Sequence, residues 1–395
     1  MRTLVAFLTL TLLLITVEAE SDPGVTDNAV KVGMIADLTG PLAFYGQQMR
    51  EGAKLYIEHI NRQGGVYGRK IDLIVEDDGY QPPKTIAAFR KLVDRDRVFC
   101  FVGNLGSATT IATFPFIERE KIPLVASGNF NSIMFTPPKR YVFALDPAYP
   151  AQLWIILKYI QQTQKETRLA VIYQDDDMGR DGLKGLREAS QYYNMPVVVE
   201  DSYKRGAVDF STQVLNTKQG NPTHVILLTV YREAAAILKK SHQLDWHPQF
   251  IGFGPAVDDK VVELAGEAAE GYMALTFLDF NTDNPSPQLK FYFDLSKRYT
   301  PDVQPRPIHA FGFAVTQILV EGLKRAGRDL TREKLVEALE TFNGWANYLG
   351  APLTYGPNIR GGTRTAAFLV KADIERRIMV RTTDWIEYRK PAEVE

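Results

Sequence analysis

The sequence predicts an α/β protein with two lobes, each built on a doubly wound, mostly parallel sheet. From Val30 onward, short apolar segments alternate with amphipathic ones, and this alternation is typical of parallel α/β folds. The alternating series occurs twice in tandem. The chain also has 395 residues, more than one hydrophobic core usually organises. Two similar lobes therefore explain the length and the repetition together.

The first series runs from residue 30 to residue 126. Its strands are expected at 32–35, 71–75, 98–102 and 122–126. The first helix carries an apolar face with the spacing of 3.6 residues per turn, made by Met49, Ala53, Tyr56, Ile57 and Ile60. Right-handed crossovers between such strands produce one twisted, mostly parallel sheet.

The second series begins after Asp146, with strands at 169–173, 197–199, 224–228 and 250–251. The remaining chain is less regular. It has a strand at 272–277, helices at 289–298, 308–326 and 331–341, and two short closing strands at 366–370 and 379–381. Helices that follow a complete α/β series usually return to an earlier lobe, so we expect discontinuous domains.

The amino-terminal segment 1–19 is typical of a secretory signal peptide. A basic Arg2 precedes an apolar run that ends at Val17, and Ala19 provides a small residue at the expected cleavage point. A membrane anchor would need roughly 18 apolar residues, more than this run supplies. The single cysteine, Cys100, lies far downstream. We therefore expect export without a lipid anchor and without an intrachain disulfide.

The composition argues against several functions. The net charge is −1, from 46 basic and 47 acidic residues, which disfavours nucleic acid or an anionic membrane surface as a partner. The acidic segments 76–78 and 175–177 have no histidine at metal-ligand spacing, so we interpret them as loop ends or helix caps. No hydrolase, nucleotide-binding or zinc-protease motif occurs. We expect no catalytic residues, no metal and no cofactor, and hence no enzyme.

Two loops that follow neighbouring strands are candidate binding segments, because doubly wound sheets bind ligands at the carboxyl ends of their strands. Residues 103–109 form a glycine-containing loop that leads into a helix, with Ser107 as its natural N-cap. Free N–H groups at a helix start favour an anion. The alternative is that Ser107 only caps its own helix. Residues 127–131 follow the next strand and are either turn formers or a second binding segment.

Several segments of the sequence form a specific combination: residues 32–41, Tyr45-Gly46, Gly52-Ala53, residues 60–70, Glu76-Asp77-Asp78, and Gly271-Tyr272 after Ala265-Gly266-Glu267. Taken together, they resemble the branched-chain amino acid type of periplasmic binding protein. The resemblance covers about 30–370. It implies an exported, monomeric periplasmic protein without a lipid anchor. Such a protein delivers a small-molecule ligand to the membrane permease of an ABC importer.

The resemblance also implies a clamshell with three hinge crossings, near 145–148, 275–279 and 353–356. The N-terminal lobe would then comprise 28–146 plus 278–354, and the C-terminal lobe 147–277 plus 355–390. Closure of the lobes around the ligand is the expected motion.

The family's ligand positions correspond to specific residues here. Tyr45 resembles the aromatic lid, Ser107 the serine that holds a ligand carboxylate, and Gly128, Asn129 and Phe130 the neighbouring backbone donors. In the second lobe Met178 replaces a stacking tyrosine. Tyr149 and Gly254, or its neighbour Phe253, replace the acidic partners of an ammonium group, and Tyr231 adds a further ring.

These replacements lead to a hypothesis about the ligand. An ammonium group is costly to bury without a carboxylate partner, so we expect a carboxylate or an amide with an apolar or aromatic body, an amino acid or a related organic acid. Two alternatives stay open. One is a ligand-sensing receptor for a signalling partner, and the other is an α/β enzyme.

Overall fold

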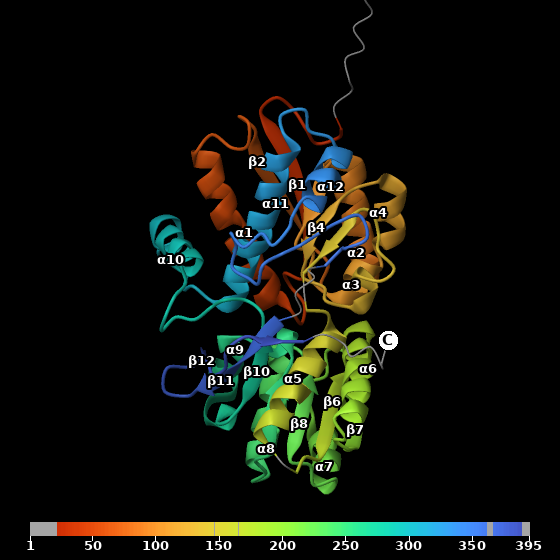
Figure 1. The fold of residues 1–395 in the computed structure, drawn as a ribbon, viewed down its shortest axis with the longest axis vertical. Helices are drawn as coiled ribbons and strands as arrows, with labels where there is room; N and C mark the ends of the chain where they lie inside the picture. Colours follow the sequence, from red (N-terminus) through yellow and green to blue (C-terminus); the bar gives the residue numbers. More distant parts are fainter. Residues whose placement is uncertain (1–21, 146, 165, 362–365, 389–395) are drawn as a thin grey trace, which may run out of the picture.

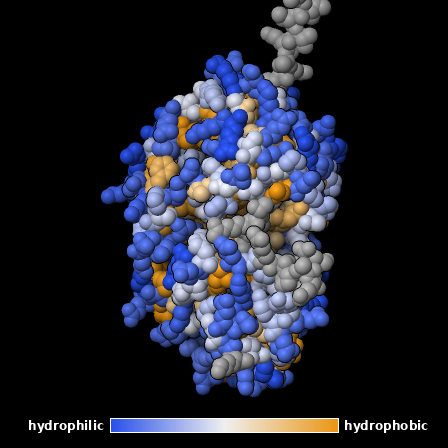
Figure 2. Space-filling model, in the orientation of Figure 1, coloured by the Kyte–Doolittle hydropathy of each residue, from blue (hydrophilic) through white to orange (hydrophobic). Residues whose placement is uncertain are grey.

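The computed structural model describes residues 22–145, 147–164, 166–361 and 366–388, which fold into two lobes stacked along the long axis (Figure 1). The predicted signal peptide, 1–19, lies outside the described residues. Within the described part of the chain, no helix combines the length and apolarity needed to cross a membrane. On the face drawn in Figure 2, hydrophilic side chains predominate and hydrophobic ones are scattered.

The first lobe contains a five-stranded parallel sheet in the order β2-β1-β3-β4-β5. The strands are β1 (Ala29–Ala36), β2 (Lys70–Asp77), β3 (Cys100–Val102), β4 (Leu124–Ser127) and β5 (Val142–Ala144). One face is covered by α1 (Ala43–Arg62) and α11 (Pro307–Ala326), and the other by α2 (Pro82–Arg90), α3 (Ser107–Ile111) and α4 (Phe114–Glu120). Helices α10 (Pro287–Tyr299) and α12 (Arg332–Glu340) pack against α1 and α11 respectively.

The second lobe contains a larger sheet in the order β12-β11-β10-β9-β8-β6-β7. The parallel strands are β6 (Leu169–Gln174), β7 (Val197–Tyr203), β8 (His224–Leu228), β9 (Gln249–Gly252) and β10 (Met273–Thr276). Strand β11 (Ala366–Asp373) is antiparallel to β10, β12 (Ile378–Arg381) and β13 (Ile386–Glu387). The helices are α5 (Tyr149–Thr163), α6 (Asp177–Tyr192), α7 (Ser211–Gln219), α8 (Tyr231–Gln243) and α9 (Asp259–Ala265).

The two sheets repeat one topology. In each lobe the first strand lies between the second and the third, and the fourth and fifth follow the third. This is the doubly wound order that the sequence predicts, with the carboxyl ends of both sets of strands directed toward the space between the lobes (Figure 1). The central strands are buried on both faces, which explains their continuous apolar runs. The predicted fold class is confirmed.

The short elements are where the sequence expectation differs from the structure. Strand β5, helix α9 and strand β13 have three, seven and two residues, too few to show a period. The single helix expected after the loop of residues 103–109 divides into α3 and α4. Pro115 occupies the first turn of α4, where its missing N–H costs nothing and its fixed φ begins a new helix.

The chain passes between the lobes after β5 and after β10, close to the first two expected crossings. The third crossing was expected near 353–356, but the structure keeps this segment with the first lobe. The Tyr355 hydroxyl donates to the Ala144 carbonyl at 2.8 Å, and the Arg360 carbonyl accepts from the Ala144 N–H at 2.7 Å. We therefore propose that the first lobe extends to Arg360 and that the second resumes at Ala366.

Candidate ligand-binding site

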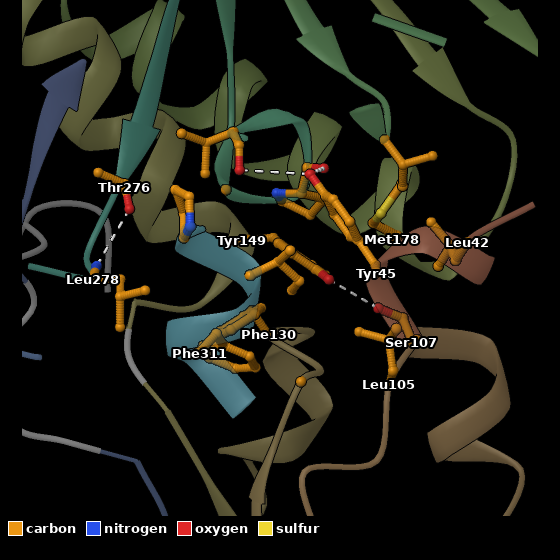
Figure 3. A pocket seen from close by; sticks show the side chains of 18 of the residues that line it. Leu42, Tyr45, Leu105, Ser107, Phe130, Tyr149, Met178, Thr276, Leu278 and Phe311 are labelled. Carbon is orange, nitrogen blue, oxygen red and sulfur yellow. Dashed lines mark hydrogen bonds between the residues drawn. The ribbon is translucent and has the colours of Figure 1, made fainter. Parts of the chain in front are cut away.

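A cavity lies between the lobes at the carboxyl ends of both sheets, and Figure 3 shows its lining side chains. Its empty volume is about 730 Å³, including the open mouth. Both lobes contribute, and so does the second crossing through Thr276, Phe277 and Leu278. Among the described residues that line it, none carries a charged side chain.

On the first-lobe side, the loop after β3 directs Ser107 into the cavity. Gly106 has a φ of +100°, a conformation open mainly to glycine, and a Cβ there would lie 2.7 Å from the Tyr80 ring. Gly106, not Ser107, is the N-cap of α3. The Ser107 hydroxyl is therefore not used as a cap and lies 3.1 Å from the Tyr149 hydroxyl of the opposite lobe.

This pair of hydroxyls is the main polar feature of the cavity wall (Figure 3). One hydroxyl donates to the other, which leaves a second proton available to an acceptor on a ligand. Burial raises the pKa of Tyr149 well above its usual range, so the phenol stays neutral and keeps its proton. The pair thus offers a hydrogen-bond donor to an oxygen acceptor.

The remaining walls are mostly apolar. Met178 enters from the start of α6, and Val230 from the turn before α8. The turn of residues 254–256 contributes Gly254 and Pro255. Near the crossings, the ring of Phe130 lies 4.9 Å from that of Phe277 and 6.1 Å from that of Phe311. This end of the cavity suits an apolar or aromatic group.

Seven of the ten residues named from the sequence line this cavity: Tyr45, Ser107, Gly128, Phe130, Tyr149, Met178 and Gly254. The other three, Asn129, Tyr231 and Phe253, are buried behind it. Tyr231 stacks on Tyr45 with ring centroids 4.5 Å apart, and the Phe253 ring lies 5.2 Å from that of Tyr149.

Gly128 differs from the backbone donor that the resemblance implies. Its N–H donates to the Asn104 carbonyl at 2.8 Å, so in this structure Gly128 supplies surface and no free donor. Its missing side chain still matters, because a Cβ would approach Leu105 at 3.2 Å. The role of each predicted residue toward a ligand stays a prediction.

Hydrogen bonds between the lobes show that this is a closed form. The Tyr45 hydroxyl donates to the Pro255 carbonyl at 3.3 Å, and the Asn131 amide donates to the Asp177 carbonyl at 2.7 Å. The Asp181 carboxylate accepts from the backbone N–H of Ser132 at 2.7 Å. These contacts join the start of α1 to the turn of residues 254–256, and the segment after β4 to the start of α6.

The carboxylates nearest the cavity are already engaged. Asp258 accepts from the backbone N–H groups of Lys260 and Ile308, and burial raises the pKa of its carboxyl. Asp176 caps α6 and forms an ion pair with Arg205 at 2.7 Å. Asp181 accepts two bonds from Ser132. The described residues that line the cavity therefore offer a buried ligand ammonium no carboxylate, and these three aspartates near it are bound by other donors.

Several cavity residues were not predicted from the sequence. Tyr80 follows β2, and inspection of each strand end would have found it. Phe311, Pro307 and Ile308 come from the start of α11, which the chain reaches only after the five parallel strands of the second sheet. The sequence assigns this helix to the first lobe, but no local pattern indicates that its start reaches the cavity.

Comparison with known proteins identifies the family. A family model described as periplasmic binding protein matches residues 29–375. This chain belongs to the periplasmic binding protein family. The match covers most of the sequence and both lobes, and the resemblance noted in the sequence is confirmed. Relatives in this family are substrate-binding proteins of ABC transporters, and this general prediction of function is confirmed as well.

Individual relatives agree in sequence and in fold. The Leucine-, isoleucine-, valine-, threonine-, and alanine-binding protein of Pseudomonas aeruginosa is 24% identical over 313 residues, covering 79% of this chain and 82% of the relative. The fatty acid ABC transporter substrate-binding protein from Thermomonospora curvata is 23% identical, with a TM-score of 0.83 and coverage of 93% and 95%. A branched chain amino acid ABC transporter structure from Thermus thermophilus, with bound valine, has a TM-score of 0.81 at 21% identity, covering 92% and 97%.

Proposed function

We propose that this periplasmic binding protein closes on a small organic acid or amide that has an apolar or aromatic body and no ammonium group. The observation that carries the proposal is the composition of the closed cavity. It presents a hydroxyl pair, Ser107 and Tyr149, on otherwise mostly apolar walls. A carboxylate or amide oxygen accepts a hydrogen bond from this pair, and the body packs among the aromatic rings.

Electrostatics argues against a zwitterionic amino acid as the preferred ligand. The desolvation of an unpaired ammonium in a closed site costs several kcal/mol. Asp176, Asp181 and Asp258 are each held by other donors. Recruiting any of them would break a helix cap or a contact between the lobes. Removing the ammonium from the ligand avoids this cost and keeps the acceptor oxygen.

The names of the relatives show that this family includes proteins named for amino acids and proteins named for acids without an amino group. The Pseudomonas aeruginosa relative is named for leucine and other amino acids, and the Thermomonospora curvata structure for fatty acids. One protein shape thus accommodates acids with and without an amino group. The uncharged lining here favours the second kind.

A thermal-shift comparison of matched ligands tests the proposal. Leucine is compared with isocaproate and isocaproamide, which share its body and lack its amino group. Phenylalanine is compared in the same way with hydrocinnamate. A ligand at 100 times its Kd stabilises the folded protein by about 2.7 kcal/mol. The acid or amide should raise the melting temperature more than the amino acid. Stabilisation by leucine alone would contradict the proposal.

The location and partner follow from the family. We propose that the protein is exported to the periplasm after removal of residues 1–19 and has no lipid anchor. It would act as a monomer and deliver its ligand to the membrane permease of an ABC importer, without catalysing a reaction. Recovering the bound compound chemically unchanged, by native mass spectrometry followed by release, tests the absence of catalysis.

A further inference from the structure

Tyr80 is a cavity residue whose position depends on contacts from both lobes. Its φ is +59°, a left-handed conformation that costs a non-glycine residue about 1 kcal/mol or more. Strained residues of this kind are typically held by their surroundings and occur at functional sites. Local folding alone therefore does not explain why Tyr80 is held in this conformation.

On the first-lobe side, two carboxylates build the turn that presents Tyr80. Asp78 accepts from the Tyr80 backbone N–H at 2.9 Å and from the Thr85 hydroxyl at 2.8 Å. Asp77 accepts from the N–H groups of Leu38 and Gly79. The acidic segment after β2 thus directs the Tyr80 ring into the cleft.

On the second-lobe side, Arg205 holds the same residue. Its guanidinium carbon lies 4.3 Å from the centroid of the Tyr80 ring, and its Nη1 donates to the Tyr80 carbonyl at 3.1 Å. Its Nη2 pairs with Asp176 at 2.7 Å. Asp176 in turn accepts from the backbone N–H of Met178, a second cavity residue.

We infer that Tyr80 is a ligand-contacting residue and that Arg205 is a positioning residue which fastens it when the lobes close, so that Arg205 sets how slowly ligand leaves. The inference rests on the proposed function. Arg205 belongs to the opposite lobe from Tyr80, so both of its contacts with Tyr80 must break when the lobes separate. Association begins in the open form, where these contacts are absent, and it should change little.

Arginine suits this role because its planar guanidinium can lie over a ring while its edge pairs with a carboxylate. Lysine would keep the charge but could not reproduce both contacts. Arg180 is a matched control, because it pairs with Asp175 within the second lobe at 2.7 Å. Arg205→Met and Arg205→Lys test the contact, and Arg180→Met tests the loss of an arginine elsewhere in that lobe.

The experiment measures association and dissociation rates of isocaproate and hydrocinnamate by stopped flow. Loss of the ring and carbonyl contacts should raise the dissociation rate about 10-fold in Arg205→Met and nearly as much in Arg205→Lys. The association rate should stay within about 2-fold, and Arg180→Met should match the wild type. Equal dissociation rates in wild type and both Arg205 variants would overturn the inference and leave the proposed function standing.

A second measurement tests the role of Arg205 without any ligand. It applies even if neither acid binds, and failure of both acids to bind would count against the proposed function. The lone Cys100 is buried, so spin labels can be placed on cysteines introduced at the exposed positions Lys54 in α1 and Leu215 in α7. Pulsed electron resonance then reports the distance between lobes in the ligand-free protein. Arg205→Met should reduce the closed population about 10-fold, and unchanged populations would overturn the inference.

Discussion

Glu233 offers a test of the structure that does not depend on the ligand. It lies in the first turn of α8 and is only 3% exposed. Its Oε2 atom has no hydrogen-bond partner among the described residues. Burial raises the pKa of this carboxyl from its ordinary 4.5 to about 7. The ionised form is therefore destabilising in the folded protein, and Glu233→Gln should relieve it.

The sign and size of the effect follow from this pKa. Between pH 4.5 and about 7 the folded state retains a proton that the unfolded state has lost, so stability falls as the pH rises through this range. Each pH unit across the interval corresponds to about 1.4 kcal/mol. Ionised Glu233 thus costs about 3 kcal/mol at pH 8, and almost nothing at pH 4.5.

Urea denaturation of ligand-free protein at pH 5 and pH 8 measures the effect. Glu233→Gln should be more stable than the wild type by about 3 kcal/mol at pH 8 and by less than about 1 kcal/mol at pH 5. Glu267→Gln, at an exposed position of the same lobe, controls for the general loss of a negative charge. A gain for Glu233→Gln that is the same at both pH values would refute the reasoning.

Three further predictions concern a buried histidine, a glycine and a cavity hydroxyl. Burial lowers the pKa of His309 to about 4, so the stability that neutral His309 contributes is lost as the pH falls from 6.5 to 4. His309→Gln keeps an acceptor for the Tyr292 hydroxyl. Its melting temperature should depend less on pH between 6.5 and 4 than that of the wild type. Gly106→Ala places a methyl group 2.5 and 2.7 Å from two neighbouring side chains and should lower the melting temperature more than Gly271→Ala, whose φ is also positive but whose surroundings are open. Tyr149→Phe should weaken isocaproate binding by about 10-fold in calorimetry, and an unchanged Kd would exclude this hydroxyl from binding.

The sequence predicted most of the fold because its long elements carry strong periodic signals. The apolar face of α1 and the continuous apolar runs of β3, β6 and β8 each bury a predictable surface. Elements of two or three residues, such as β5 and β13, bury too little to leave a pattern. We propose a later third crossing than the sequence indicates, because Tyr355 and Arg360 bond to first-lobe residues over 200 positions away, which no local pattern reveals.

The sequence by itself determined the two α/β series and the strand ends at which a ligand binds, since parallel strands direct their carboxyl ends to one edge. It could place Ser107 and Tyr149 near the site but could not show that their hydroxyls meet at 3.1 Å. Only the tertiary structure brought Phe311 from α11 into the cavity, engaged the surrounding carboxylates, and set Arg205 over Tyr80. These are contacts between residues distant in the sequence, and their energy depends on distances that local residue patterns do not encode.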